Sequence, residues 1–258
     1  MHMLQVDDLR VRAGQTTIVQ DIGFCVDEGE WVMLVGPNGA GKSTIANAIS
    51  MGMPSTGRIF LDGRDIRSMK QGEISRFLGV LAQSHAVSYA FTVEEIVSLG
   101  RYEHAKGFLS AKNADDAQKV EEALEITGLT VQRRQSVLTL SGGELQRTFL
   151  AQVFAQDPKL LVSDEPTNRL DLKYQQQVFE LIRNWLHTPG RAVLSIVHDL
   201  SLAQAYGSRA ILLHCGKIVR DAPVRDVFTP EALNCVYDTD VFSWMREMSR
   251  PWQDKVSD

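Results

Sequence analysis

One glycine-rich segment, placed directly after a short apolar run, limits what this chain can fold into more than any other part of its sequence. The apolar run is Trp31–Val35. The segment consists of Gly36, Pro37, Asn38, Gly39, Ala40, Gly41, Lys42, Ser43 and Thr44. It fits the pattern G-x-x-x-x-G-K-[ST], in which a strand leads into a loop whose backbone N–H groups surround a polyphosphate at the start of a helix. The sequence therefore predicts an α/β fold with a phosphate site at the end of a buried strand.

Two side chains of this segment have the chemistry that a nucleotide requires. Lys42 would reach the β- and γ-phosphates, and the Ser43 hydroxyl would ligate Mg²⁺. A tight turn between strand and helix would explain the glycines, but it would leave Lys42 and Ser43 without a role. We therefore expect a nucleoside triphosphate and Mg²⁺ at this segment.

The apolar pattern along the chain predicts two kinds of sheet. From Trp31 onward, short apolar runs alternate with longer helical segments, which is typical of a mainly parallel sheet covered by helices. The strands expected there are Trp31–Val35, Gly79–Ala82, Leu160–Ser163 and Ala192–Val197, followed by Ala210–Leu213 and Lys217–Arg220. Before Trp31, the β-like runs Leu4–Val11 and Ile22–Val26 predict an antiparallel β layer.

Helical signals replace the sheet pattern between residues 90 and 140. Asp115–Thr127 has apolar residues at helical spacing and is followed by Gly128 as a stop signal. We expect a helical subdomain at 90–140, inserted into a catalytic core of residues 1–89 and 141–240. A further helix, Leu172–Leu186, carries an apolar stripe that we interpret as core packing. Residues 241–258 are expected to be a polar tail, disordered past Pro251.

Composition limits the class of protein and its partners. The chain has 258 residues, enough for one large α/β domain, and its net charge of -5 gives no general electrostatic footprint for nucleic acid. No apolar run approaches the roughly 18 residues of a membrane-spanning helix, and the first residues lack the pattern of a secretory signal. The expected compartment is the cytosol. Cys25, Cys215 and Cys235 show no metal or redox spacing, and we expect all three to be core thiols.

Two adjacent acids end a predicted buried strand. The segment Leu160–Ser163 is followed by Asp164 and Glu165. Adjacent residues at a strand end point to different sides, so the two carboxylates can serve different tasks. We expect Asp164 to hold Mg²⁺, directly or through water, and Glu165 to orient and deprotonate the attacking water.

Two further polar residues follow predicted strands. His198 comes after Ala192–Val197, and Gln83 comes after Gly79–Ala82. Ligands of open α/β sheets bind at the carboxyl ends of the strands. We assign His198 to the γ-phosphate and the attacking water, and Gln83 to Mg²⁺ or the water. Taken singly, a lone histidine is more often structural, and Gln83 would be an ordinary surface amide.

The segment Leu140–Arg147 predicts a second anion site. Ser141 is suited to cap a helix that extends to about Gln156, and Gly142 and Gly143 follow it. A helix N-terminus of this kind should bind an anion. Capping alone would explain the serine and the glycines, but not why a chain with one phosphate loop has a second phosphate-binding element.

With these motifs in order, the chain resembles the ATP-binding-cassette (ABC) ATPases over almost its whole length. The motifs that match are the loop at Gly36–Thr44, Gln83, the segment Leu140–Arg147, the acids Asp164 and Glu165, and then Asp171 and His198. The resemblance implies ATP and Mg²⁺ as ligands. It also implies a P-loop NTPase core with the β layer and the helical insertion described above.

The resemblance further implies the partners. In that family, the signature segment of one subunit covers the γ-phosphate held by the loop of another, so a head-to-tail homodimer is expected, with Ser141, Gly142, Gly143 and Asp171 among its nucleotide contacts. Integral membrane permease subunits are the expected partners at the cytoplasmic face of the cell membrane, and an extracytoplasmic solute-binding protein acts indirectly. No nucleic-acid partner is expected.

Three positions depart from the family pattern. Ala13 stands where an aromatic residue commonly stacks on adenine, Ser163 replaces an aliphatic residue, and Asn168 stands where serine is more usual. The adenine contact is therefore open. The changes at Ser163 and Asn168 are not expected to touch the phosphate chemistry.

The choice of transported solute rests on shorter stretches. Phe91–Val97 followed by Gly100 and Arg101 is similar to importers of iron-siderophores, haem and cobalamin, so we expect uptake of a metal chelate. Importers of zinc or manganese and a non-transport ABC ATPase of iron–sulfur cluster assembly are the alternatives. Co-purification with a membrane protein would favour transport. A P-loop kinase would leave Leu140–Arg147 without a role.

Overall fold

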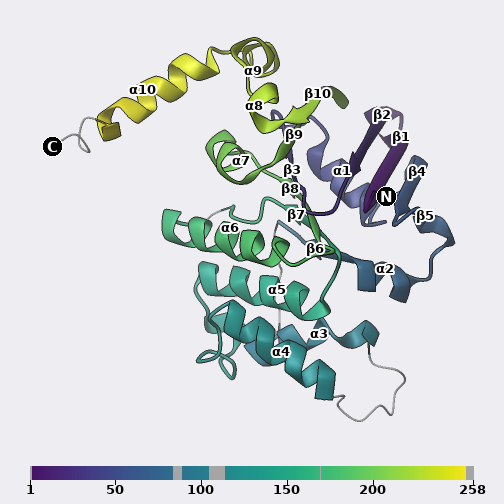
Figure 1. Ribbon diagram of the computed structural model, residues 1–258, viewed down its shortest axis with the longest axis vertical. Coiled ribbons are helices and arrows are strands. Elements are labelled where there is room, and N and C mark those ends of the chain that lie inside the picture. The colour runs from purple at the N-terminus through teal and green to yellow at the C-terminus, as the bar shows by residue number, and fades with distance from the viewer. Residues whose placement is uncertain (1, 84–88, 105–113, 169, 254–258) are drawn as a thin grey trace.

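The computed structural model describes residues 2–83, 89–104, 114–168 and 170–253 (Figure 1). The first sheet is antiparallel, with strand order β2-β1-β4-β5. The second has the order β10-β9-β3-β8-β7-β6, and all its neighbours are parallel except β10 and β9. The strands are β1 Leu4–Ala13, β2 Thr16–Val26, β3 Trp31–Val35, β4 Thr56–Leu61, β5 Arg64–Asp65, β6 Leu78–Leu81, β7 Leu160–Asp164, β8 Ala192–Ile196, β9 Arg209–His214 and β10 Lys217–Pro223.

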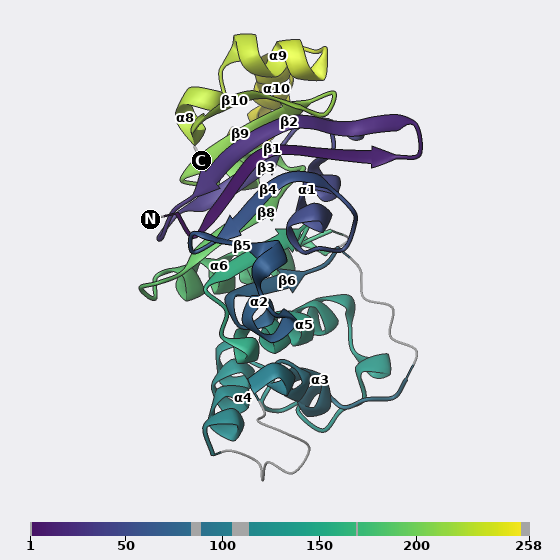
Figure 2. The ribbon, with the colours of Figure 1, turned by 90° about the vertical axis from the view of Figure 1, so that its right-hand side faces the viewer.

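Helices cover both faces of the parallel sheet. Helix α1 lies between the two sheets, and α6, α5 and α4 follow one another away from the opposite face (Figures 1 and 2). The α-helices are α1 Lys42–Ile49, α2 Gln71–Phe77, α3 Val93–Leu99, α4 Ala114–Ile126, α5 Gly142–Gln156, α6 Leu172–Leu186, α7 Leu200–Tyr206, α8 Val224–Val227, α9 Pro230–Tyr237 and α10 Val241–Gln253. The predicted α/β class, with its antiparallel N-terminal layer, is confirmed.

Strand β3 divides the core because its successive side chains point to opposite faces. Val32 and Leu34 pack in the cluster between the two sheets. Trp31, Met33 and Val35 pack on the other face, with the helices. All five are buried, as expected for a central strand of a parallel sheet. The phosphate segment therefore follows a strand that is held on both faces.

Two predictions from the sequence are wrong. Cys215 and Cys235 are exposed and Cys25 is only partly buried. Cys215 is exposed because it lies in the tight turn between β9 and β10, with φ 48°. The polar tail is instead a helix that continues through Pro251 to Gln253 and extends away from the other elements (Figure 1). Trp244, Met248 and Trp252 recur every four residues in it, which is helical spacing. Residues 254–258 lie outside the described residues.

No helix among the described residues has both the length and the apolar character needed to span a bilayer. The proposed boundaries of the helical subdomain at 90–140 stay a prediction. Helix α3 of that range packs on α5, which lies beyond it. Arg101 joins these helices to α4, since its guanidinium donates to the Asp116 carboxylate at 2.8 Å and to the Ala155 carbonyl at 2.9 Å.

Gly100, at the end of α3, sits against the backbone of α5. A Cβ there would lie 2.2 Å from the Gln152 carbonyl oxygen, although φ is an ordinary -58°. We predict that Gly100→Ala destabilises the protein by about 2 kcal/mol through overpacking. This corresponds to a fall in Tm of about 4–8 °C in thermal unfolding.

Gly52→Ala is the matched control, because its Cβ would meet nothing closer than 3.4 Å. Equal Tm values for the two variants would contradict the close packing of α3 on α5.

Candidate nucleotide-binding site

Four strands deliver the predicted site residues to one edge of the parallel sheet. Strand β3 leads into the loop at Gly36, and β7 ends in Asp164 and Glu165. Gln83 follows β6, and His198 follows β8. Since these strands are parallel, their carboxyl ends meet at the same edge. The structure thus brings together residues that are up to 162 positions apart in the sequence.

The phosphate loop has a backbone that presents N–H groups to an anion. Gly36 has φ 145°, and a Cβ at this position would lie 2.2 Å from the Leu213 carbonyl oxygen, so only glycine fits. Gly41, in the left-handed conformation, precedes α1 and provides no side-chain cap. The first N–H groups of α1 therefore have no capping side chain and can bind phosphate oxygens.

Lys42 is held inside this loop, with 5% of its surface exposed. Its ammonium group donates to the carbonyl oxygens of Gly36 at 2.7 Å and Pro37 at 3.0 Å. Burial lowers the pKa of Lys42, and the nearby charges of Glu165 and Asp164 oppose this effect. A bound triphosphate would supply stronger, charge-assisted acceptors than the two carbonyls.

Ser43 and Asp164 form the pair that suits Mg²⁺. The Ser43 hydroxyl donates to an Asp164 carboxylate oxygen at 3.3 Å. Both groups offer hard oxygen ligands, the type that Mg²⁺ prefers. Burial raises the pKa of Asp164, and the charge of Glu165 adds to this effect, whereas the Ser43 hydrogen bond opposes it. A cation at this place would remove the cost of the buried charge.

Glu165 receives polar contacts from three sides. One carboxylate oxygen accepts from the Gln83 amide at 2.7 Å and from the Asn168 amide at 2.8 Å. The other lies 2.5 Å from Nε2 of His198. The Glu165 side chain is 13% exposed. These contacts fix the carboxylate beside the loop, where it can accept a proton from a water molecule.

The loop and the polar residues around Glu165 line two adjoining cavities. One cavity of about 350 Å³ is bounded by Lys42, Ser43, Glu165 and His198, with Ile18 at its side. A second, of about 620 Å³, shares Asn38, Glu165 and His198 with it. The arrangement therefore places a phosphate-binding loop, two oxygen ligands for a cation and a candidate base around one space.

Leu140–Arg147, which is the signature segment in the family pattern, lies elsewhere on the molecule. Ser141 caps α5, accepting from the Glu144 N–H at 3.3 Å and donating to the Glu144 carboxylate at 2.7 Å. Gly142 is exposed, and a Cβ at Gly143 would lie 2.5 Å from the Tyr174 ring. No residue of Leu140–Arg147 lines either cavity at the phosphate loop. Within one chain, the two predicted anion sites are therefore not joined.

Asp171 is placed as a helix cap. Its carboxylate accepts from the Tyr174 N–H at 3.1 Å at the start of α6. Neither cavity at the phosphate loop includes it. The nucleotide contact predicted for Asp171 stays a prediction.

One interpretation of the sequence requires correction. The Asn168 amide donates directly to Glu165, so this departure from the family pattern does touch the predicted base. The sequence signal for this contact was that Asn168 lies only three residues after Glu165. In the structure the two residues form a tight turn, in which the Asn168 N–H donates to the Glu165 carbonyl oxygen at 3.1 Å.

Ile18 was also missed, because an apolar residue in a strand carries no chemical signature. It lines the cavity of the phosphate loop, whereas Ala13 lies exposed at the end of β1. Ile18 therefore offers apolar surface next to the loop, whereas Ala13, at the position where an aromatic residue commonly stacks on adenine, has only a small side chain.

Asp164 allows a prediction about stability. Its raised pKa means that the folded protein binds this proton more tightly than the unfolded chain does. The resulting stabilisation is present at low pH and is lost as pH rises through the raised pKa. At neutral pH without nucleotide or Mg²⁺, Asp164→Asn should therefore raise Tm slightly, by about 2 °C, since partial exposure screens the cost.

Thermal unfolding at neutral and acidic pH tests this, because the gain should shrink as wild-type Asp164 becomes protonated. A lower Tm for the variant at neutral pH would contradict the assignment of a buried, costly charge.

Known proteins resemble this chain over most of its length. A family model described as ABC transporter matches residues 19–168. The hemin import ATP-binding protein HmuV of Pseudomonas entomophila is 39% identical over 246 residues, covering 93% of this chain and 94% of the relative. The iron(3+)-hydroxamate import ATP-binding protein FhuC of Bacillus subtilis is 34% identical over 241 residues, covering 93% and 89%. The chain spans 54% of the length of another Bacillus subtilis relative, the ABC transporter ATP-binding protein YvrA, at 34% identity over 92% of this chain.

Two solved structures extend the comparison. A metal-chelate type ABC transporter in an inward-facing conformation superposes with a TM-score of 0.80 at 25% identity, covering 93% of this chain and 90% of that chain. A dimeric ATP-binding cassette bound to ADP and Pi superposes with a TM-score of 0.74 at 25% identity, covering 86% and 99%.

Proposed function

Because the chain belongs to the ABC transporter family, we propose that it is the ATP-binding and ATP-hydrolysing subunit of an importer, working as a head-to-tail homodimer. One observation carries the proposal. The carboxylate of Glu165 is held by Gln83, Asn168 and His198 beside the loop that contains Lys42. This is a base positioned next to a phosphate cradle.

The residues divide the reaction among them. Lys42 and the N–H groups of α1 bind the β- and γ-phosphates, and Ser43, Asp164 and Gln83 would hold Mg²⁺. When bound, Mg²⁺ neutralises charge on the phosphate oxygens. Glu165 accepts a proton from the water that attacks the γ-phosphate, and His198 holds Glu165 and the water in position. The products are ADP and inorganic phosphate.

The second copy supplies what one chain lacks. Ser141 and Gly142 are exposed at the start of α5 and line neither cavity of their own chain. A two-fold arrangement would bring this helix N-terminus to the γ-phosphate bound by the partner, where its N–H groups stabilise negative charge. The dimeric ADP-bound cassette among the structural neighbours supports this arrangement.

The transported solute belongs to the metal-chelate class, and this chain works at the cytoplasmic face of the cell membrane with integral membrane permease subunits as its partners. Relatives named for hemin and iron(3+)-hydroxamate import support the solute class. A permease would dock near Gln83 and the helices that follow it. Tyr89 and Tyr102 expose 72% and 75% of their surface there, so two aromatic side chains are available to a partner.

Removing the base should separate binding from chemistry. We predict that Glu165→Gln lowers the ATPase rate by at least about 100-fold while ATP and Mg²⁺ still bind. An ATP-bound dimer should therefore accumulate, and light scattering after gel filtration measures it. Glu125→Gln, an exposed change on α4, is the control and should behave as wild type. A Glu165→Gln protein that stays monomeric and hydrolyses ATP at the wild-type rate would refute the proposal.

Mixing two inactive variants tests whether two chains share each triphosphate. Lys42→Ala removes a phosphate contact. Gly142→Asp places a negative charge at the helix start, which favours the helix but repels a partner's phosphate. Its side chain has space, since the nearest atom to a Cβ there lies 4.0 Å away.

Each variant alone should lose ATPase activity, but an equal mixture should recover it. In a head-to-tail dimer about one quarter of the composite sites would then carry neither change. Gly142→Ala is the matched control for the glycine. Failure of the mixture to recover activity would contradict shared sites.

A further inference from the structure

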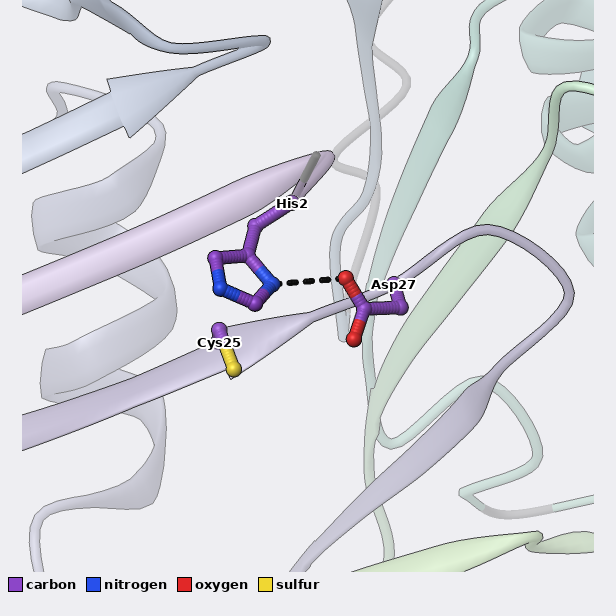
Figure 3. A group of neighbouring side chains, drawn as sticks. All are labelled: His2, Cys25 and Asp27. Atoms are coloured by element: carbon purple, nitrogen blue, oxygen red, sulfur yellow. Dashed lines mark hydrogen bonds and ion pairs between the residues drawn. The ribbon is translucent and has the colours of Figure 1, made fainter.

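Three side chains with metal-binding chemistry meet at the junction of β1, β2 and β3, away from the nucleotide site. They are His2, Cys25 and Asp27 (Figure 3). Each offers one ligand atom, and these atoms all lie within 4.8 Å of one another. The closest pair is Nδ1 of His2 and a carboxylate oxygen of Asp27, 2.6 Å apart.

We propose that His2, Cys25 and Asp27 form a binding site for a divalent transition-metal ion of the Zn²⁺ class. An imidazole nitrogen, a thiolate and a carboxylate are the three ligand types that such ions take, with bonds of about 2.0–2.3 Å. Thiolate and imidazole select against Mg²⁺ and Ca²⁺, which prefer oxygen ligands alone. Water completes the coordination from the exposed side, where the His2 side chain is 45% accessible.

The backbone holds the three residues in place before any ion arrives. The Met3 N–H donates to the Val26 carbonyl oxygen at 2.9 Å, and Gln5 pairs with Cys25 in the β1–β2 ladder. The Cys25 carbonyl oxygen also accepts from Arg209 at 3.0 Å. These bonds tie the start of β1 to the end of β2, so a small adjustment of side chains would close the site.

Asp27 is fixed in the same way. Its N–H donates to the Glu30 carboxylate at 2.9 Å, and its own carboxylate faces His2 (Figure 3). The Glu30 carboxylate itself is engaged by this bond and by Arg209 at 3.4 Å. The candidate ligand set is therefore separate from the ion pairs around Arg209.

A simple His2–Asp27 ion pair explains less of the arrangement. Both side chains are nearly half exposed, 45% and 47%, and exposed pairs of this kind contribute little to stability. The pair also gives no role to the Cys25 sulfur, which shares the space with them. A metal ion would use all three atoms.

The site is remote from the phosphate loop. Asp27 precedes β3, and the loop begins at the other end of that strand. Five strand residues span roughly 16 Å, so an ion held by Asp27 cannot act on the triphosphate. Its effect would be to link the first residues of the chain to the β2–β3 connection and so to stabilise the folded state.

Cobalt provides a direct readout, because a thiolate bound to Co²⁺ gives a charge-transfer absorption band in the near ultraviolet. The full-length, tag-free, nucleotide-free protein is titrated with Co²⁺ and then with Zn²⁺ as competitor. We expect one equivalent of Co²⁺ to produce the band and Zn²⁺ to abolish it. Binding should weaken as pH falls, because the thiol must lose its proton.

Variants identify the ligands. Cys25→Ser should abolish the band, and His2→Gln and Asp27→Asn should each weaken Co²⁺ binding by more than about 10-fold, the loss that even outer-shell changes can cause. Cys215→Ser is the matched control, since Cys215 is an exposed thiol outside this group and should leave the band unchanged. Zn²⁺ should raise the Tm of the wild type and of Cys215→Ser, but not that of Cys25→Ser.

Three results would overturn the proposal. The first is a band that persists in Cys25→Ser, and the second is that His2→Gln and Asp27→Asn bind Co²⁺ as tightly as the wild type. The third is that the wild type gives no band. Because no nucleotide is present, these outcomes are independent of the ATPase assignment.

Discussion

The parallel register of β3, β8, β7 and β6 is the constraint on which the site depends. Each strand is followed within two residues by a part of the site, namely Gly36 after β3, Gln83 after β6, Glu165 after β7 and His198 after β8. Hydrogen bonding between neighbouring strands brings these ends to one edge. A slip of one residue in any strand would turn its side chains to the other face. Glu165 would then lose contact with Gln83 or His198, although every residue of the motif were still present. Chemistry at this edge is therefore a property of strand pairing as much as of the individual side chains.

A buried polar chain below that edge helps to hold the register. The Trp31 indole donates to the Ser195 hydroxyl at 2.8 Å, and the Ser195 and Ser163 hydroxyls lie 2.6 Å apart. These residues sit on β3, β8 and β7, and both serines are fully buried. Because an unpaired hydroxyl in this place would be costly, the three strands are favoured in the one alignment that satisfies all three groups. Ser163 directly precedes Asp164, so this alignment also sets where the two acids emerge.

The strands of the second sheet and the helix Leu172–Leu186 were predictable because their apolar patterns are strong and their ends carry capping or turn residues, whereas β4 and β5 of the first sheet were not predicted. The phosphate loop and the acids were predictable because their spacing reflects backbone geometry. Contacts that depend on a turn were not: Asn168 reaches Glu165 across a turn in which Glu165 has φ 48°, a conformation that its sequence does not signal. Burial of cysteines and the helix at Val241–Gln253 were misjudged for another reason. A short thiol fits many environments. Pro251 is unfavourable inside a helix, although Trp244, Met248 and Trp252 lie at helical spacing.

Glycine is found at positions 142 and 143 for different physical reasons, and the difference bears on how two chains assemble. Gly143 is required within its own chain, since a side chain would collide with the Tyr174 ring. Gly142 has open space beside it, so nothing in the folded monomer requires a glycine there. A residue with no side chain at the exposed start of a helix allows another molecule to approach the backbone N–H groups closely. The ligand that fits those groups is an anion, and the chain's own phosphate loop does not reach them. A phosphate bound by a second copy is an anion and comes from outside the chain, so it fits both of these observations.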